Sequence, residues 1–257
     1  ENGEEILADR VVSNVDAKKT FLGLMEPEDA GEKVVKAAKR YKSRGSSGKL
    51  NIALNGVPEF TALPKGSELI KGDFHIVDNM ESYERGYDEW KDGMWSTNPY
   101  LDILIPTLTD PTMAPPGKHF MTCFVQYCPA KVKGQDWNAD LLKKFGDNVI
   151  NSIAKYSPNF KDLIEHVEIR SGQVIDNEIG LTDGNIFQGE LSLNQLMFNR
   201  PFHGCAQYRG PVNGLYLSGS TTHPGGGVMG APGANSAREI LMDMKISTTV
   251  PEDEGDD

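Results

Sequence analysis

The most informative part of the sequence runs from Gly214 to Leu241 and reads GLYLSGSTTHPGGGVMGAPGANSAREIL. Its apolar beginning, Leu215–Ser218, predicts a short buried strand, and residues 235–244 have the pattern of a helix. The loop between them consists mostly of glycine and other small residues. Because the first N–H groups of a helix have no partner within it, this order predicts a cradle for an anion or a carbonyl group.

Glycine makes this loop open to a ligand, because a backbone without Cβ atoms can approach a large planar molecule or a phosphate closely. The glycines concerned are Gly225, Gly226, Gly227, Gly230 and Gly233. Three of them match G-x-G-x-x-G, but we do not interpret the match as a Rossmann fingerprint. The glycines do not follow the strand directly, and no further strand–helix unit comes after them.

Upstream of this stretch, helices and strands are mixed without strict alternation. Strands are predicted over 50–56, 69–78, 101–108 and 119–128, which are rich in β-branched and aromatic residues. Helices are predicted over 26–42, with Pro27 in the first turn, and over 138–156, where apolar residues recur every three or four positions. The pattern is typical of an α+β region with a mixed sheet.

The N-terminal residues have the signature of a β-hairpin. Asn2-Gly3 is a strong two-residue hairpin turn, and residues 5–12 read as the strand that follows it. The strand that should precede the turn is not in the sequence, which opens at Glu1 without an initiator Met. We therefore expect a fragment that begins inside a domain.

Composition is that of an ordinary globular protein of 257 residues, with 38% hydrophobic residues, 25% charged residues and a net charge of −11. Five carboxylates lie within 252–257, and without them the net charge is −6. A net acidic chain disfavours nucleic acid as a partner. No apolar run could span a bilayer, no signal peptide opens the chain, and the three cysteines form no C-x-x-C. We expect reduced thiols and a cytoplasmic protein, or a mitochondrial-matrix protein in a eukaryote.

The sequence lacks the motifs of several other enzyme classes. The sequence has no G-x-S-x-G, no H-E-x-x-H, no P-loop and no cysteine pair with metal-ligand spacing, which disfavours hydrolases, metalloenzymes and NTPases. Four histidines show no ligand spacing and are expected to be non-catalytic: His75, His119, His166 and His203.

A basic segment extends from Lys33 to Lys49, with seven basic residues and no acidic one. It is interpreted either as a patch for a lipid surface or an anionic partner, or as a solvated helix face followed by a Gly/Ser-rich loop. The composition of this segment does not distinguish between the two interpretations.

The motifs together resemble the phytoene-desaturase-like FAD-dependent oxidoreductases, a family with an amine-oxidase-like fold. The most specific match is Thr222–Val228, which contains His-Pro-Gly-Gly-Gly, and Gly214–Ser220 and Gly230–Gly233 match as well. Supporting matches lie at 8–14, 110–117, 156–159, 180–187 and 200–201. The resemblance covers roughly residues 1–245.

This resemblance implies an FAD site in the Gly-rich stretch. Gly219 and Ser220 would lie beside the ribityl–phosphate part of FAD, and residues 223–225 would line the isoalloxazine. The N–H groups of Val228 and Met229, at the start of the predicted helix, would face the N1/O2 edge, where a helix N-terminus stabilises negative charge. The full implied set is Gly219, Ser220, His223, Pro224, Gly225, Gly226, Gly227, Val228, Met229 and Gly230.

The roles of His223, Gln188 and Arg200 stay open at this point. His223 is either a catalytic proton donor beside the flavin or a residue that shapes the turn before Pro224. Many relatives carry a histidine where this sequence has Gln188, which puts an acid–base role there in doubt. Arg200, before Pro201, either anchors a substrate carboxylate or ends a helix or strand with a surface salt bridge.

The sequence thus predicts an α+β/α/β fold, with a mixed-sheet substrate domain and the C-terminal strand–Gly loop–helix of a Rossmann-like FAD-binding domain whose N-terminal part is missing. Four segments are expected. They are a returning strand of the FAD domain at 1–22, the substrate-binding domain at 23–195, the C-terminal FAD-binding segment at 196–246 and an acidic disordered tail at 247–257.

The predicted function is that of the C-terminal part of an FAD-dependent oxidoreductase, which oxidises a lipophilic small molecule by hydride transfer to flavin. No metal is expected. The missing N-terminal FAD-binding half would be its partner, and the fragment alone would be inactive and hold FAD weakly. The alternative is a non-catalytic interaction module that binds a protein or, through the basic segment, an anionic membrane surface.

Overall fold

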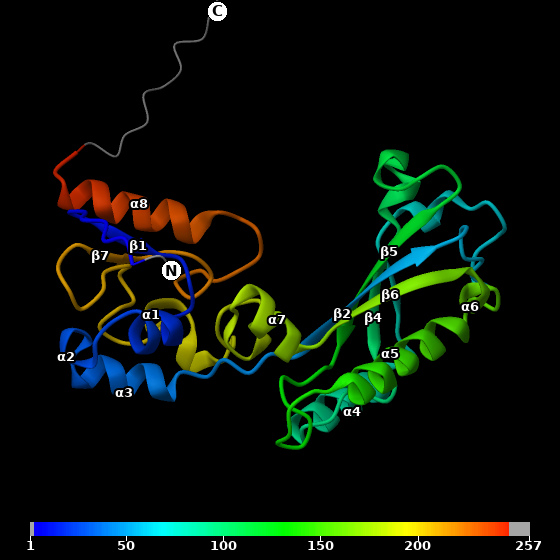
Figure 1. Cartoon of the computed structure of the whole chain (residues 1–257), viewed down its shortest axis with the longest axis horizontal. Helices are drawn as coiled ribbons and strands as arrows, with labels where there is room; N and C mark the ends of the chain where they lie inside the picture. The colour runs from blue at the N-terminus through cyan, green and yellow to red at the C-terminus, as the bar shows by residue number, and fades with distance from the viewer. Residues whose placement is uncertain (1–2, 247–257) are drawn as a thin grey trace, which may run out of the picture. The chain divides into compact units, whose positions relative to one another are not determined.

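The structure is a computed structural model that describes residues 3–246 (Figure 1). The chain divides into two compact units, which we describe separately. Unit 2 is one continuous stretch, residues 44–185, whereas unit 1 combines residues 1–43 with residues 186–257. Unit 2 is therefore inserted in the sequence of unit 1.

A five-stranded sheet forms the centre of unit 2. Its strands are β2 (Ser47–Leu54), β3 (Phe74–Ile76), β4 (Tyr100–Leu104), β5 (His119–Gln126) and β6 (Ile164–Arg170). They lie in the order β3-β4-β5-β2-β6, and every neighbouring pair is antiparallel. The prediction of a mixed sheet in this part of the chain is therefore wrong, because the parallel pairing of the chain lies in unit 1.

The core of unit 2 lies on one face of this sheet. Alternate residues of the three central strands are buried there: Leu50, Ile52, Leu54, Leu101, Ile103, Met121, Cys123 and Val125. Helix α5 (Ala139–Ala154) packs against the same core with Phe145, Val149 and Ile153. Such alternation is typical of an antiparallel sheet with one covered face. Apolar burial of this extent is the main source of stability.

Shorter elements complete unit 2. The helices are α4 (Met80–Lys91), α6 (Phe160–Leu163) and α7 (Gly172–Ile179). Single 3-10 turns lie at Glu68–Lys71, Pro106–Leu108, Pro111–Met113 and Thr182–Gly184.

Unit 1 contains a parallel pair of short strands, β1 (Val11–Ser13) and β7 (Leu215–Leu217). Its helices are α1 (Ala17–Gly23), α2 (Pro27–Ala30), α3 (Glu32–Arg40) and α8 (Ala231–Asp243), and 3-10 turns lie at Leu193–Gln195 and Met197–Asn199. The buried apolar cluster is small and consists of Ala17, Phe21, Ala38, Tyr41, Cys205 and Leu217. Polar and backbone contacts therefore have a larger part in holding this unit together.

The strongest periodic patterns predict the right elements. The helix expected at 138–156 is confirmed as α5, with the Asn138 side chain accepting a hydrogen bond from the Leu141 N–H at 3.0 Å. The strand expected at 119–128 is confirmed as β5, and the one at 50–56 as β2, which begins three residues earlier.

Other predicted elements are shorter or interrupted. The helix expected at 26–42 is broken into α2 and α3 at Gly31, whose φ of 78° lies outside the helical region. The strand expected at 69–78 contains a 3-10 turn and only three strand residues, and the one at 101–108 ends in a turn that begins at Pro106. Proline has no N–H to donate to a sheet, which accounts for the early end of the strand predicted at 101–108.

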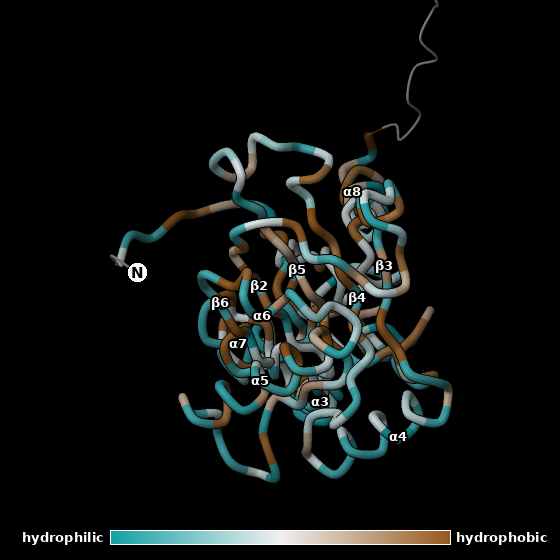
Figure 2. The backbone as a smooth tube through the Cα atoms, turned by 90° about the vertical axis from the view of Figure 1, so that its right-hand side faces the viewer, coloured by the Kyte–Doolittle hydropathy of each residue, from teal (hydrophilic) through white to brown (hydrophobic). Residues whose placement is uncertain are grey.

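The strand expected at 5–12 is reduced to β1. Ile6 and Leu7 are 82% and 87% exposed in the extended segment near the N-terminus, visible as the brown stretch beside the N label in Figure 2. The turn at Asn2 and the tail at 247–257 lie outside the described residues.

The domain boundaries differ from those expected at 22/23 and 195/196. Residues 23–43 belong to unit 1, because Ala38 and Tyr41 pack into its apolar cluster. Residues 186–195 belong to it as well, since the Glu190 N–H donates to the Lys42 carbonyl at 2.9 Å.

The three cysteines are free, as expected from the sequence, and the structure also places all three in buried positions. Burial raises the pKa of all three thiols, that of Cys205 to about 11. Among the helices of residues 3–246, none combines the length and the apolar character that a membrane span requires.

The buried face of the sheet gives a direct test of where stability resides. Ile103 is fully buried on β4, whereas the next residue, Leu104, is 37% exposed. We expect Ile103→Ala to lower the free energy of unfolding by about 2–5 kcal/mol through a cavity, measured by urea denaturation. The matched control Leu104→Ala should cost less than about 1 kcal/mol, and equal losses would contradict the assignment of the core face.

Candidate functional site: the glycine loop between β7 and α8

The loop from Ser218 to Gly230 joins β7 to α8 in unit 1. It leaves the strand through a close contact: a Cβ atom on Gly219 would lie 2.7 Å from the Asn14 carbonyl oxygen, and its φ is 83°. No other residue fits there without strain. The Gly219 carbonyl then accepts from the N–H of Thr222 at 3.1 Å and from its hydroxyl at 3.0 Å. The first part of the loop is thus a defined turn.

His223 lies exposed in the middle of the loop, and its peptide bond to Pro224 is cis. Its backbone is held by a residue that the sequence analysis did not select. The buried Tyr208 donates its hydroxyl hydrogen to the His223 carbonyl at 2.9 Å, and the Asn235 amide of α8 donates to the same Tyr208 hydroxyl at 2.9 Å. Tyr208 therefore links the centre of the loop to the helix that follows it.

Gln188 forms a second brace. Its side-chain oxygen accepts from the Thr221 N–H at 3.0 Å, and its amide donates to the Asn14 carbonyl at 2.9 Å. The Thr221 hydroxyl accepts from the Ala17 N–H at 3.2 Å, at the N-terminus of α1. Gln188 therefore joins the loop to the segment that follows β1.

Arg200 is fully buried beneath the loop. Its guanidinium donates twice to the Ser220 carbonyl, from Nε at 2.9 Å and from Nη2 at 2.7 Å. It also donates to the carbonyls of Phe187 at 2.6 Å and Gln195 at 3.2 Å. Longer contacts reach the carbonyls of Glu190 and Gly189, each at 3.5 Å. One side chain thus holds the loop and residues 187–195 together.

One part of the sequence interpretation of Arg200 is confirmed, because the residue ends the 3-10 turn Met197–Asn199 as its C-cap. The other parts need correction. A surface salt bridge is wrong, because the side chain is buried and its partners are backbone carbonyls. Its donors are occupied by these carbonyls, which leaves no free face for a substrate carboxylate. Burial lowers the pKa of Arg200. The group nevertheless stays charged at neutral pH, since an arginine side chain is not deprotonated in proteins.

The second half of the loop exposes backbone donors. Among residues 3–246, the five consecutive N–H groups from Gly226 to Gly230 donate no hydrogen bond. Glycines with positive φ supply the shape: φ is 105° at Gly225, 130° at Gly227 and 68° at Gly230. Five adjacent free donors with few side chains over them fit an anionic or carbonyl-bearing ligand such as the flavin of FAD.

The helix that follows begins four residues before the predicted residue 235, but after Val228 and Met229, whose N–H groups were expected at its start. Val228 and Met229 precede the N-cap, Gly230, and α8 begins at Ala231. Their side chains are exposed. Pro232 at the second helical position accounts for the early start relative to residue 235, since proline is favoured in a first turn.

The far end of α8 is anchored to β7 by charge. Arg209 contacts Glu239 at 2.6 Å and Asp243 at 2.8 Å, and the Tyr216 hydroxyl donates to Asp243 at 2.8 Å. Asp243 lies in the last turn of the helix, where a negative charge is unfavourable unless a cation compensates it. Its hydrogen bonds from Arg209 and Tyr216 lower the pKa of Asp243 to about 2.

The structure thus brings Gly219, Ser220 and the residues from His223 to Gly230 into one loop, as the strand–loop–helix pattern predicts. It shows no interaction that assigns a proton-transfer role to His223, and both interpretations of that residue stay predictions. The bracing residues Tyr208 and Asn235 were missed, because nothing in the local sequence links them to the loop.

The basic segment is divided between the two units, with Lys33–Lys42 in unit 1 and Arg44 and Lys49 in unit 2. On α3 the basic side chains Lys33, Lys36, Lys39 and Arg40 are exposed. The Arg44 guanidinium lies 4.7 Å from the centre of the Trp90 ring. Binding to an anionic partner through this segment stays a prediction.

Comparison with curated proteins gives extended matches. The chain is 34% identical to the mouse (Mus musculus) pyridine nucleotide-disulfide oxidoreductase domain-containing protein 2, over 95% of this chain and 43% of that protein. It is 26% identical to a phytoene desaturase of Phycomyces blakesleeanus over 89% of this chain and 37% of that protein. Over most of its length the chain is thus similar to phytoene-desaturase-like oxidoreductases. The sequence motifs had favoured this family and the branch of the mouse protein.

The matched region is a limited part of these relatives. The chain spans less than half the length of the mouse protein and of the phytoene desaturase. A third relative, a limonene dehydrogenase component of Castellaniella defragrans, is 28% identical over 56% of this chain and 27% of its own. No protein-family model matches the sequence.

The buried guanidinium can be tested by a substitution that keeps its charge. Arg200→Lys removes the fork that reaches several carbonyls at once, so we expect the free energy of unfolding to fall by about 1–3 kcal/mol per carbonyl left unpaired. Urea denaturation measures this. The control Arg238→Lys, at an exposed position on α8, should change stability by less than about 0.5 kcal/mol. A similar small effect at both positions would contradict the role given to Arg200.

The anchor of α8 predicts a specific pH dependence. The pKa of Asp243 falls from 3.8 to about 2 on folding, so the ionised side chain stabilises the fold above pH 3.8 and this contribution is lost as the pH falls toward 2. We expect the difference in Tm between the wild-type chain and Asp243→Asn to be constant above about pH 5 and to shrink between pH 4 and 2. Asp140→Asn, at an exposed position in the first turn of α5, is the control for general acid effects. A difference independent of pH would exclude the proposed pairing.

Proposed function

We propose that this chain is the part of an FAD-dependent oxidoreductase that carries the flavin-facing loop, and that the enzyme oxidises a lipophilic small molecule. The observation that carries the proposal is the row of free N–H donors from Gly226 to Gly230, next to a family-specific His-Pro-Gly-Gly-Gly segment. FAD would supply the two-electron acceptor for hydride transfer from substrate. The chain supplies binding groups and their positioning.

The donors suit the electron-rich edge of a flavin. Reduction of a flavin increases the negative charge on its N1/O2 edge, and backbone N–H groups of Val228 and Met229 would stabilise that charge without titrating themselves. The buried positive charge of Arg200 contacts the Ser220 carbonyl within the same loop. It adds a fixed field of the same sign as the donors.

A pocket in unit 2 supports the proposal of a lipophilic substrate, although charged residues, Glu59, Lys65, Glu68 and Lys71, also line it. It measures about 610 Å³, within the usual size range for small-molecule sites, and Val57, Phe60, Leu63 and Leu108 are among the apolar residues that line it. The relatives named for phytoene and limonene agree with an apolar substrate. We propose that this cavity belongs to the substrate side of the enzyme.

A further FAD-binding half is proposed as the partner of unit 1. Val11 and Val12 on β1 are 55% and 50% exposed, although strands in parallel pairs are usually covered on both faces. A neighbouring domain or chain that supplies the pyrophosphate site would cover them. The chain alone is therefore expected to bind FAD weakly.

The loop can be tested directly by amide NMR of the whole 257-residue chain titrated with FAD. We expect the N–H signals of residues 225–230 to shift in fast exchange, because these donors contact the flavin. Gly227→Val should abolish the shifts, since φ there is 130° and a Cβ atom would lie 2.9 Å from the Met229 side chain. The control Gly66→Val also replaces a glycine with positive φ, but in an open loop of unit 2.

Two outcomes of that titration count against the proposal. Shifts absent from residues 225–230, or shifts that persist in Gly227→Val, would show that the loop is not the flavin contact. Submicromolar binding by the chain alone would instead contradict the proposed need for a separate FAD-binding half.

A further inference from the structure

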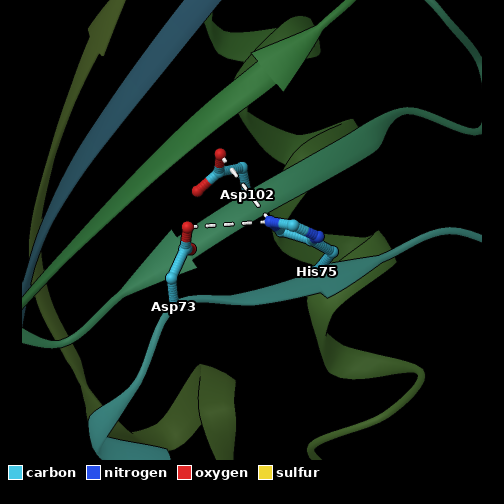
Figure 3. A group of neighbouring side chains, drawn as sticks. All are labelled: Asp73, His75 and Asp102. Carbon is cyan, nitrogen blue, oxygen red and sulfur yellow. Dashed lines mark ion pairs between the residues drawn. The ribbon is translucent and has the colours of Figure 1, made fainter.

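A histidine and two aspartates converge at the edge of the five-stranded sheet in unit 2. His75 on β3 and Asp102 on β4 are directly opposite each other in the antiparallel register, and Asp73 lies two residues before His75. Residues two apart along an extended chain point to the same face, so all three side chains meet (Figure 3). Dashed lines in Figure 3 mark the ion pairs that join the imidazole to the two carboxylates.

The donor atoms have the spacing that one metal ion requires. The His75 Nε2 atom lies 3.7 Å from Asp73 Oδ2 and 3.9 Å from Asp102 Oδ2, and one donor atom of each residue lies within 4.8 Å of the others. Two ligand atoms that each lie about 2.1 Å from the same ion can be at most about 4.2 Å apart. Both histidine–aspartate distances are below that limit, and the two aspartate oxygens lie within 4.8 Å of each other.

The charges of the cluster favour a cation. Within residues 3–246, His75 is the sole basic side chain that forms an ion pair with Asp73 or Asp102. Two carboxylates held this close repel each other, and a divalent ion between them would remove the repulsion.

The surroundings also suit a site with room for a ligand. Asp73 and His75 line a second cavity of about 440 Å³, together with apolar residues such as Phe74 and Ile76. The centre of the Tyr100 ring lies 5.2 Å from that of the imidazole. Three protein ligands leave at least one coordination position of an ion open, as in zinc sites that bind water or a substrate oxygen.

We propose that Asp73, His75 and Asp102 bind one first-row divalent cation, such as Zn²⁺, with its open position toward this cavity. An imidazole nitrogen with two carboxylates suits Zn²⁺ or Mn²⁺, whereas Ca²⁺ needs six to eight oxygen ligands. The sequence motifs predict no metal, because His75 has no ligand at helical or Cys-x-x-Cys spacing. The site depends on strand pairing, and it is independent of the proposed flavin chemistry.

Isothermal titration of the EDTA-treated, dialysed chain with ZnCl₂ tests the site. We expect one equivalent of Zn²⁺ per chain, little competition by Ca²⁺, and Co²⁺ absorption bands in the visible range when Co²⁺ replaces Zn²⁺. His75→Ala and Asp102→Asn should each weaken binding by about tenfold or more, since even indirect support of a ligand is worth that much. Both residues are partly exposed, so circular dichroism should show an unchanged fold.

The matched control is His166→Ala. His166 is an exposed histidine on β6, the strand at the opposite edge of the same sheet. It should leave Zn²⁺ binding unchanged. Absence of stoichiometric binding, equal affinity in the wild type and both cluster variants, or loss of binding in His166→Ala would each overturn the proposal.

Discussion

A buried guanidinium group must find hydrogen-bond acceptors in the protein, because it has lost those of water. Arg200 finds them in the backbone carbonyls of residues 187–195 and Ser220. This requirement fixes two irregular segments against each other, although neither contains a strand or a long helix. The glycine loop starts from that fixed point, with Tyr208 and Gln188 as further attachments. A substitution that weakens the hydrogen bonds of Arg200, Tyr208 or Gln188 would therefore disturb the glycine loop before it disturbed the rest of unit 1.

The two units are stabilised by different interactions. In unit 2 the apolar face of one sheet and the helix α5 supply a continuous core. In unit 1 the apolar cluster has six fully or nearly buried members, and single side chains that bond to the backbone carry more of the structure. A loop that must present its N–H groups to a ligand needs this kind of support, since apolar packing alone does not orient a backbone.

The sequence predicts best where a pattern is local. The period of α5, the apolar content of β5 and the glycines between β7 and α8 are visible residue by residue. These two elements, and the presence of a glycine-rich loop between a strand and a helix, were therefore predicted correctly. Arg200 was interpreted as a surface or substrate group, because its acceptors are carbonyls that no side-chain pattern reveals. The aspartate–histidine cluster was missed for a related reason: His75 meets Asp102 only through the strand register. The breaks at Gly31 and Pro106 show that single residues override longer patterns.

The buried cysteines have a practical consequence. All three thiols are shielded, and their raised pKa values keep them protonated at neutral pH, so they are poor nucleophiles toward maleimides. The native chain is consequently a ready background for site-specific labelling. A cysteine introduced at the exposed Val228 would take up a fluorophore selectively and report on the glycine loop.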